Sequence, residues 1–285
     1  MKLAVNLEHI TSLEAHLIMQ KKYAVNYIEV RPQTVNGNKG TFIGCDTVKV
    51  KDLLNQYDVK AAAVSLADFK NRLSPKAEEY SVALLDSVEF AHAIGAKFVN
   101  HYICLTELPL VFSVSELMRY IGPALKKAEE LGVTLVLENE SIDATRTPER
   151  LLEILLEVDS NYYKTNYDAS NFYAGSVEGY PWAYDILKEH IVYAHIKDAC
   201  LYNPAVGHTV SSKGFEMIGY NEDKFIYFPM IPHGSVNNVG ILHRLKQDGY
   251  KGFCTMEPHT TIEYLEDYLR QESAFLQGLN LFDEV

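Results

Sequence analysis

The sequence predicts a single (β/α)8 TIM barrel that spans residues 1–285 as one domain. Short apolar or β-branched runs alternate with longer amphipathic patterns eight times, and no linker-like segment interrupts them. Some of the short runs, such as LVL at 135–137, are apolar on both faces, which is typical of parallel strands covered by helices. Eight strand–helix units at this chain length favour one closed barrel.

Eight strands and eight helices are expected in order. The strands cover residues 2–6, 27–30, 59–66, 96–102, 133–139, 162–169, 191–198 and 252–258. The helices cover residues 10–23, 47–57, 75–93, 114–131, 147–158, 181–189, 237–248 and 262–279. Pro75 and Pro148 stand at first helical positions, where a missing N–H costs nothing. Gly132 follows the fourth helix as a C-cap, and Leu265 and Leu269 share one face of the last.

One long segment breaks the alternation. Residues 199–236 separate the seventh strand from its helix, although connections of about two to six residues are usual in α/β folds. The segment is rich in Tyr, Phe, Lys and His, a mixture suited to covering a polar ligand, and His233 is a candidate substrate contact within it. We interpret it as a lid; an ordered insertion without contact to substrate is the alternative.

Composition favours a globular protein and excludes several partners. Apolar residues make up 47% of the chain, and 38 acidic residues against 26 basic ones give a formal charge of −12. Because this charge repels phosphate backbones and anionic lipids, we expect neither nucleic acid nor membrane as a partner. The N-terminal residues lack a signal-peptide pattern, which predicts a cytoplasmic protein. The 19 tyrosines would suit a homodimer or homotetramer interface.

Chemistry-bearing side chains gather at the ends of the last four strands. The chain has no Gly-rich nucleotide motif, no G-x-S-x-G elbow and no H-E-x-x-H motif. Instead, the fifth to eighth strands end near Glu138, Asp168, His195 and Glu257. In a closed barrel these strands are neighbours, and their C-terminal ends surround the mouth where barrel active sites lie. We therefore expect the four side chains to converge.

The converging residues predict a metal ion. Three carboxylates in a partly desolvated mouth repel one another unless a cation neutralises them. Carboxylate oxygens with one imidazole form a hard, mixed ligand set, which suits Mn²⁺, Mg²⁺ or Co²⁺, with Zn²⁺ as a further candidate. Taken singly, each acid is better explained as a solvated or salt-bridged strand end, and His195 as a core residue. Their joint pattern predicts one divalent metal ion, with Mn²⁺ as first choice.

The same residues resemble the xylose isomerase-like (AP endonuclease 2) superfamily of sugar and sugar phosphate isomerases and epimerases, over nearly the whole chain. The family pattern has a strand-end Glu, a strand-end Asp with a polar residue three positions later, an H-x-K-D strand and a final strand-end Glu. The residues of this chain that resemble it are, in the same order, Glu138, Asp168 with Asn171, His195 to Asp198, and Glu257. The resemblance implies that Glu138, Asp168, His195 and Glu257 ligate one divalent metal ion. The segment IPHGSVN at 231–237 resembles the family's Gly-containing loop before the last helix.

Two positions depart from the ketose 3-epimerase branch of this superfamily. Leu201 stands where that branch has an Arg for the substrate, and Asn171 stands where it has a His. Both changes remove a polar contact expected for a free ketose, so the resemblance implies the metal site but no particular carbohydrate. The DNA-repair branch has a His-rich three-metal centre; the acidic charge and the shortage of further His at strand ends argue against it.

Glu138 and Glu257 are the expected catalytic bases. A metal that binds a carbonyl oxygen and the neighbouring hydroxyl would stabilise the enediolate formed when the α-proton leaves. Two bases on different strands would return the proton to the opposite face and epimerise a sugar, sugar phosphate or related polyol; one base would give an aldose–ketose isomer. Loss of a β-hydroxyl would instead make the protein a lyase, similar to an inosose dehydratase. A barrel that binds metal and sugar without turnover is the non-catalytic alternative.

Further side chains near the mouth are candidate substrate contacts. They are Glu29, Arg31, His101, Asn171, Lys197 and His233. Glu29 and Arg31 share one face of the second strand, where an internal salt bridge is an equal alternative. His101 ends the fourth strand and could position a hydroxyl, shuttle a proton or serve the structure alone. Lys197 points the same way as His195 and could bind a substrate oxygen or neutralise a neighbouring carboxylate.

Overall fold

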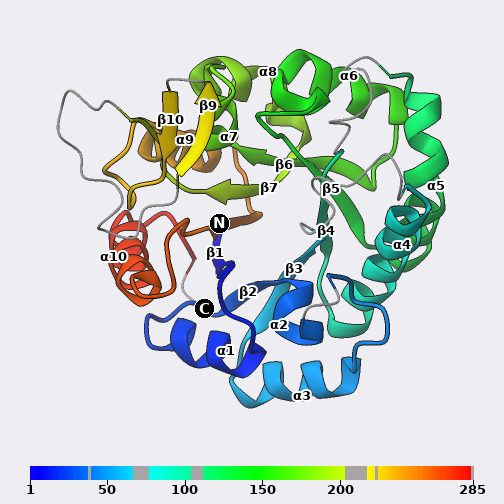
Figure 1. Cartoon of the computed structure of the whole chain (residues 1–285), viewed down its shortest axis with the longest axis horizontal. Helices are drawn as coiled ribbons and strands as arrows, with labels where there is room; N and C mark the ends of the chain where they lie inside the picture. The colour runs from blue at the N-terminus through cyan, green and yellow to red at the C-terminus, as the bar shows by residue number, and fades with distance from the viewer. Residues whose placement is uncertain (38–39, 67–76, 104–111, 203–216, 222–223, 284–285) are drawn as a thin grey trace.

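Parallel strands close into a barrel in a computed structural model, which describes residues 1–37, 40–66, 77–103, 112–202, 217–221 and 224–283 (Figure 1). The order of strands around the barrel is β1-β11-β7-β6-β5-β4-β3-β2. These strands are β1 (Lys2–Val5), β2 (Tyr27–Val30), β3 (Lys60–Ser65), β4 (Phe98–His101), β5 (Thr134–Glu138), β6 (Tyr163–Asp168), β7 (Ile191–Ile196) and β11 (Phe253–Met256). The predicted (β/α)8 barrel is confirmed, with each strand inside or next to its expected range.

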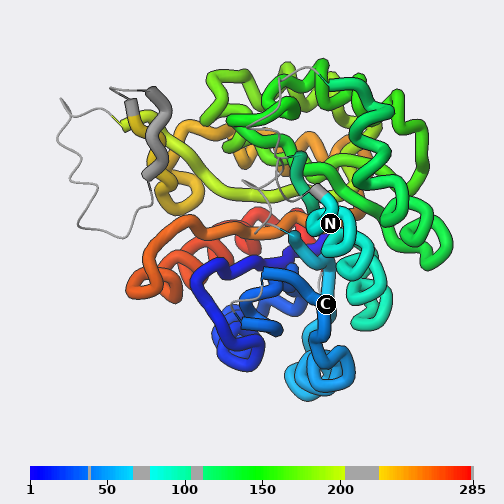
Figure 2. The backbone as a smooth tube through the Cα atoms, turned by 45° about the vertical axis from the view of Figure 1, so that its right-hand side comes forward, coloured from blue at the N-terminus to red at the C-terminus, as the bar shows by residue number. Residues whose placement is uncertain are grey.

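Helices form a ring around the strands (Figures 1 and 2). They are α1 (Leu13–Lys21), α2 (Pro32–Asn36), α3 (Thr47–Gln56), α4 (Ala77–Ile94), α5 (Val114–Leu131), α6 (Pro148–Val158), α7 (Ala169–Ala174), α8 (Tyr184–Leu187), α9 (Asn238–Gln247) and α10 (Leu265–Gly278). Ser113 and Glu116 form a capping box at the start of α5, and Gly132 ends it with a φ of 68°. The predicted helix start at Pro75 lies outside the described residues. None of the described helices is long and apolar enough to cross a membrane.

The expected helix over 181–189 is interrupted. It consists of a π-helical turn η4 (Gly179–Ala183), α8, and a 3-10 turn η5 (Lys188–His190). Tyr180 is extended at φ −146° and ψ 132°, as the α region is disfavoured for a residue that precedes a proline. A further 3-10 turn, η3 (Ala144–Arg146), and the short helices α2 and α7 were not predicted, because none spans two full helical turns.

Side chains fill the barrel in layers. An aromatic layer of Tyr27, Phe98, Tyr193 and Phe253 lies near the starts of the strands, with contacting ring centroids 5.0 to 6.2 Å apart. A hydrogen-bonded polar layer lies on the side of the strand ends and includes Asn6, Glu29, Ser65, Asn100 and Asn166. The aromatic layer therefore separates the two ends of the barrel, and buried polar groups gather towards the C-terminal end.

The long segment after β7 contains secondary structure of its own. β8 (Cys200–Leu201), β9 (Met217–Asn221) and β10 (Lys224–Tyr227) form an antiparallel sheet in the order β8-β10-β9. This sheet lies beside the barrel in Figure 1. Ile226 and Phe228 are buried against Ala174 of α7. The expected lid over 199–236 is thus partly an ordered insertion, and its residues 203–216 lie outside the described part of the chain.

Candidate metal centre

Four strand ends bring one His and three carboxylates together. Glu138 ends β5, Asp168 ends β6, His195 lies in β7 and Glu257 follows β11. The register pairs Asp168 with His195 across β6 and β7. The ligand atoms of the four side chains all lie within 4.8 Å of one another, and all four residues are buried. The structure therefore brings together the four residues that the sequence predicted as ligands.

The two ring nitrogens of His195 have different surroundings. Nε2 lies 2.9 Å from Oε2 of Glu29, which fixes the plane of the ring. Nδ1 lies 3.2 Å from Oε2 of Glu138 and 3.6 Å from Oε2 of Glu257, without the alignment of a hydrogen bond. Burial alone would lower the pKa of His195, but Glu138, Glu29 and Glu257 raise it well above its ordinary value. One ring nitrogen thus contacts a carboxylate behind the ring, and the other faces the carboxylates of the cluster. Metal-ligating His residues have this arrangement.

Amide side chains surround the carboxylate of Glu138. Its Oε2 accepts hydrogen bonds from Nδ2 of Asn100 at 2.7 Å and from Nδ2 of Asn166 at 3.2 Å. Its Oε1 accepts one from Nδ2 of Asn171 at 3.1 Å. Burial raises the pKa of Glu138, yet the neighbouring His195 outweighs burial and lowers the pKa to about 2. Glu138 is therefore held as a fixed carboxylate.

One oxygen of Asp168 caps α7 and the other faces the site. Oδ1 accepts hydrogen bonds from the backbone N–H groups of Ser170 and Asn171 at 2.8 and 3.0 Å. Oδ2 lies 2.7 Å from Nζ of Lys197, which lies 2.6 Å from Oε2 of Glu257. Burial would lower the pKa of Lys197, but these two carboxylates raise it well above its ordinary value. An ammonium group thus lies between two of the four candidate ligands.

Glu257 is surrounded by basic side chains. Besides Lys197, Nε2 of His259 lies 3.3 Å from its Oε2, and an η nitrogen of Arg31 lies 3.6 Å from its Oε1. Burial raises the pKa of Glu257, but Lys197 and His195 outweigh it and hold the pKa well below its usual range. The long segment after β7 adjoins this group, since the ring centroid of Phe228 lies 4.7 Å from that of His259.

The donor set fits a divalent cation. Nδ1 of His195 is buried without a hydrogen-bond partner, and three carboxylates lie within reach of the same point. The outer contacts of Glu29, Asn100 and Asn171 fix the orientation of the ligands, as outer-shell groups do in metal sites. Carboxylate oxygens with one imidazole suit a hard or borderline ion. This buried cluster could therefore hold a metal ion.

The candidate substrate contacts fall into two groups. Lys197 contacts Asp168 and Glu257, Asn171 contacts Glu138, and Arg31 adjoins Glu257. Arg31 also pairs with Glu8, so the internal ion pair considered for this strand end is present, with partners other than Glu29. Both oxygens of Glu29 are used, one by Asn6 and the other by His195. The structure thus places Glu29 behind the metal ligands.

His101 lies on the outer face of the barrel wall. Its Nδ1 lies 2.7 Å from the hydroxyl of Tyr80 in α4, and its ring lies 5.6 Å from that of Tyr163. Burial lowers the pKa of His101 to about 3, so the ring is neutral at ordinary pH. The alternation of β4 instead turns Asn100 inward, onto Glu138. The structure does not bring His101 to the site of the four candidate ligands.

His233 lies in a turn that Asp198 organises. The carboxylate of Asp198 accepts hydrogen bonds from the backbone N–H groups of Gly234 and Val236 at 2.8 and 3.0 Å. A Cβ on Gly234 would lie 2.0 Å from Oδ1 of Asp198, which accounts for a glycine in this loop. The His233 side chain is exposed. The structure does not place His233 among the four candidate ligands.

Several site residues escaped the sequence analysis. They are Asn6, Asn100, Asn166, Glu8 and His259. A signal for one of them was present, because Asn166 stands two positions before Asp168. Residues two apart share one face of a strand. An amide in an apolar strand, on the face of a candidate ligand, therefore indicates a hydrogen bond to that ligand.

Comparisons with known proteins agree with this architecture. The model of the xylose isomerase-like TIM barrel family matches residues 21–279. Solved structures that match include a xylose isomerase domain protein from Planctomyces limnophilus, at 15% identity and a TM-score of 0.74, covering 98% of this chain and 96% of the other. No curated protein matches the sequence.

Two further solved structures are similar to this chain. One is the IOLI protein with a bound zinc atom, at 18% identity and a TM-score of 0.69, covering 99% of this chain and 97% of that one. The other is D-allulose 3-epimerase from Methylomonas sp. in complex with D-allulose, at 15% identity and a TM-score of 0.70, covering 98% and 96%. At such identities the likeness shows the fold alone. The family match over residues 21–279 does more: this chain belongs to the xylose isomerase-like TIM barrel family.

Proposed function

We propose that the protein is a divalent-metal-dependent isomerase or epimerase of a sugar, sugar phosphate or related polyol. The observation that carries the proposal is the pair of environments around His195. Its Nε2 is held by Glu29, while its buried Nδ1 is aimed at Glu138 and Glu257 without a hydrogen bond. Membership of the family and the likeness to a D-allulose 3-epimerase support a carbohydrate as the substrate.

Glu138, Asp168, His195 and Glu257 would hold the metal ion, with Mn²⁺ as first candidate and Mg²⁺, Co²⁺ or Zn²⁺ as alternatives. When bound, such an ion supplies Lewis-acid chemistry, which makes a proton next to a carbonyl group easier to remove. The surrounding groups prepare the site for it. The amides of Asn100 and Asn171 hold Glu138, and the backbone N–H groups at the start of α7 hold Asp168.

Glu138 and Glu257 would transfer the proton. Both carboxyl groups are charged at neutral pH and can therefore accept a proton. They come from β5 and from the end of β11, and β6 and β7 lie between these strands in the barrel. A substrate held between them presents one face to each carboxylate. Removal of the proton by one carboxylate, and delivery to the opposite face of a proton that the other carboxyl group has taken up from solvent, inverts the carbon, which is epimerisation.

Lys197 and Arg31 would hold the oxygens of the substrate. Both are buried cations that contact Glu257, and Nζ of Lys197 lies between Glu257 and Asp168. A substrate oxygen beside these two cations can accept hydrogen bonds from them. Asn171 already donates to Glu138, so its contribution is to position that carboxylate. The proposed substrate site therefore has positive charge beside Glu257, one of the two proton-transferring groups.

Hydrogen exchange with solvent tests the proposal. Metal-loaded protein is incubated in D₂O with ketoses, inososes and their phosphates, and loss of the α-proton signal is followed by NMR. We expect exchange with at least one substrate, slowed by about 10²- to 10⁴-fold in Glu138→Gln and in Glu257→Gln. Glu157→Gln, a change at an exposed position of α6, is the matched control and should leave the rate unchanged.

The products distinguish the alternatives. Exchange in which the recovered carbohydrate differs from the substrate in mass only by the incorporated deuterium supports isomerisation or epimerisation. A product that has lost one water molecule would show that the protein is a lyase and not an isomerase or epimerase. If a carbohydrate binds saturably but does not exchange its α-proton with any of the candidate metal ions, the protein binds sugar without turnover. Metal content is measured on every variant, so that loss of the ion is not mistaken for loss of a base.

A further inference from the structure

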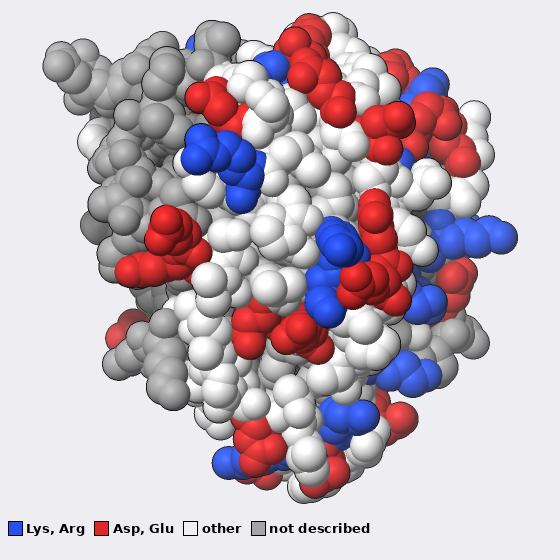
Figure 3. Space-filling model, turned by 90° about the vertical axis from the view of Figure 1, so that its right-hand side faces the viewer, with Lys and Arg blue, Asp and Glu red and all other residues white. Residues whose placement is uncertain are grey.

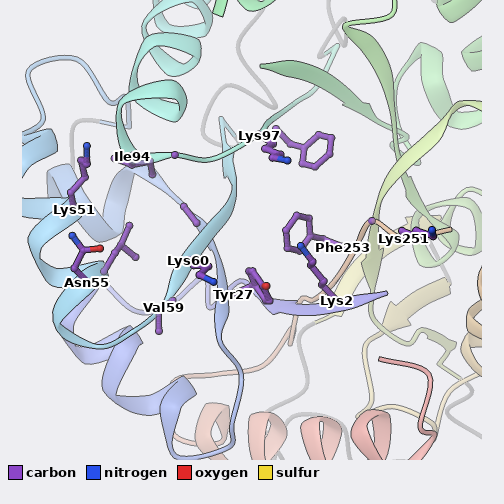
Figure 4. Close-up of a pocket in the computed structure, with 15 residues that line it drawn as sticks. Lys2, Tyr27, Lys51, Asn55, Val59, Lys60, Ile94, Lys97, Lys251 and Phe253 are labelled. Carbon is purple, nitrogen blue, oxygen red and sulfur yellow. The ribbon is translucent and has the colours of Figure 1, made fainter. Parts of the chain in front are cut away.

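A second cavity lies at the opposite end of the barrel. Its volume is about 500 Å³, and its walls come from the starts of β1, β2, β3, β4 and β11 and from α3 and the end of α4. Five lysines line it: Lys2, Lys51, Lys60, Lys97 and Lys251. Figure 4 shows that they reach it from different sides. The aromatic layer of Tyr27, Phe98 and Phe253 forms its inner wall, so the cavity is separate from the metal centre.

These five lysines have no carboxylate partner among the residues that the structure describes. No Asp or Glu lines the cavity. Nζ of Lys2 lies 5.3 Å from the ring centroids of Tyr27 and Phe253, which carry no charge. On α5, by contrast, Lys127 contacts Glu130 and Glu89. Acidic and basic side chains are interspersed on the side of the molecule that Figure 3 shows. Around this cavity, five ammonium groups instead lie together without a carboxylate partner among the described residues, in a chain of net charge −12.

Compensation of helix dipoles does not account for the lysines. Cations stabilise a helix when they lie in its last turn. The last turn of α3 contains no basic residue, and that of α4 contains His92 alone. Lys2 and Lys60 begin strands, while Lys97 and Lys251 lie just before β4 and β11. Mutual repulsion among such groups favours an anion in their midst.

The geometry points to a binding site for a small molecule that carries at least two adjacent phosphate groups. The volume matches the size of small-ligand pockets, about 300 to 1,000 Å³. Ammonium groups that come from different elements around a cavity of this volume can each contact a different oxygen of two adjacent phosphate groups. The amide of Asn55 adds a neutral hydrogen-bonding group at the wall. The acidic remainder of the surface repels a long polyanion such as nucleic acid.

Calorimetry with inorganic pyrophosphate tests this site. The full-length protein is titrated at constant ionic strength with pyrophosphate, orthophosphate and citrate. We expect saturable binding of pyrophosphate, weaker binding of the other two anions, and weakening of the pyrophosphate affinity as salt is raised. The double variant Lys60→Gln/Lys97→Gln should bind pyrophosphate about tenfold or more weakly. Both side chains are exposed, so their replacement spares the core.

A charge-matched control separates the cavity from general attraction. The double variant Lys49→Gln/Lys126→Gln removes two exposed lysines outside the cavity, one of them from α3 itself. This control should bind pyrophosphate as the wild type does. Equal loss in both double variants, no saturable binding to the wild type, or tighter binding of citrate than of pyrophosphate would overturn the assignment. Because Lys197 and the four metal ligands are intact in every variant, these results are independent of the proposed function.

Discussion

Nε2 of His195 lies 2.9 Å from Oε2 of Glu29, although the two residues belong to strands that are separated in the barrel by β1 and β11. Oε1 of the same carboxylate accepts a hydrogen bond from Asn6 at 3.1 Å. Glu29 thus holds the imidazole from behind, and the other ring nitrogen is directed into the cluster of carboxylates. A residue expected to contact substrate is better understood as one that positions a metal ligand.

Replacement of Glu29 should weaken metal binding without removing a ligand. In Glu29→Gln the negative charge behind His195 is lost, and the affinity for Mn²⁺ should fall by about 10- to 100-fold. Competition with a chromogenic chelator measures this affinity. Glu14→Gln makes the same change at an exposed position of α1 and should have no effect. An unchanged affinity in Glu29→Gln would contradict the positioning role.

Removal of Lys197 should make the fold depend on metal. Its ammonium group lies within 2.7 Å of carboxylate oxygens of both Asp168 and Glu257, so Lys197→Met leaves two buried negative charges without this partner. Breaking a buried ion pair in this way costs about 3–5 kcal/mol. Thermal unfolding with and without Mn²⁺ should therefore show a larger stabilisation by Mn²⁺ in Lys197→Met than in the wild type. Equal stabilisation of both proteins would argue that the ion binds away from these carboxylates.

Stability should fall as pH rises because of Glu272. This side chain of α10 is buried, and burial raises its pKa from 4.5 to about 8. Between these values the folded protein retains a proton that the unfolded chain has released, so this residue lowers the unfolding free energy by up to about 1.4 kcal/mol per pH unit. Glu272→Gln keeps an acceptor for the N–H of Ile231 and should remove this contribution. Denaturant unfolding at several pH values should show the variant gaining on the wild type above pH 5; parallel curves would refute the assignment.

The loop at Gly234 should not tolerate a side chain. A Cβ there would lie 2.0 Å from Oδ1 of Asp198 and 2.9 Å from the carbonyl oxygen of Ala199. We expect Gly234→Ala to reduce the unfolding free energy by about 1–3 kcal/mol, because the turn must shift to relieve the clash. Gly278→Ala provides the comparison, since nothing lies within 4 Å of a Cβ at that position. Similar urea midpoints for Gly234→Ala and the wild type would show that the turn moves freely.

The order and type of the barrel elements could be predicted because they depend on local patterns. Alternation of apolar runs with amphipathic segments is visible in the sequence, and parallel strands joined by helices have few ways to close. The convergence of the four candidate ligands could be predicted for the same reason, since strand ends meet at one mouth of a barrel. The small sheet of β8, β9 and β10 was hidden because its strands are short and because β8, which has 2 residues, pairs with β10 well after it in the chain.

The contacts behind the ligands could not be predicted, because they depend on which face of each strand turns inward. Asn100 and His101 are adjacent polar residues of β4, and only one of them can point into the barrel. The structure turns Asn100 onto Glu138 and His101 onto Tyr80. The pairing of Glu29 with His195 further depends on the register of β2, which has an irregularity between Ile28 and Glu29. Neither choice is encoded in residue spacing alone.

The most direct test of the account is the number of divalent metal ions that each chain binds. Protein stripped with a chelator is dialysed against Mn²⁺, Co²⁺ or Zn²⁺, and the bound metal is quantified by mass spectrometry for the wild type, Glu138→Ala and His195→Ala. We expect one ion per wild-type chain and loss of that ion in both variants. A wild type that binds none of the three ions, or variants that retain a full equivalent, would contradict a metal centre at Glu138, Asp168, His195 and Glu257.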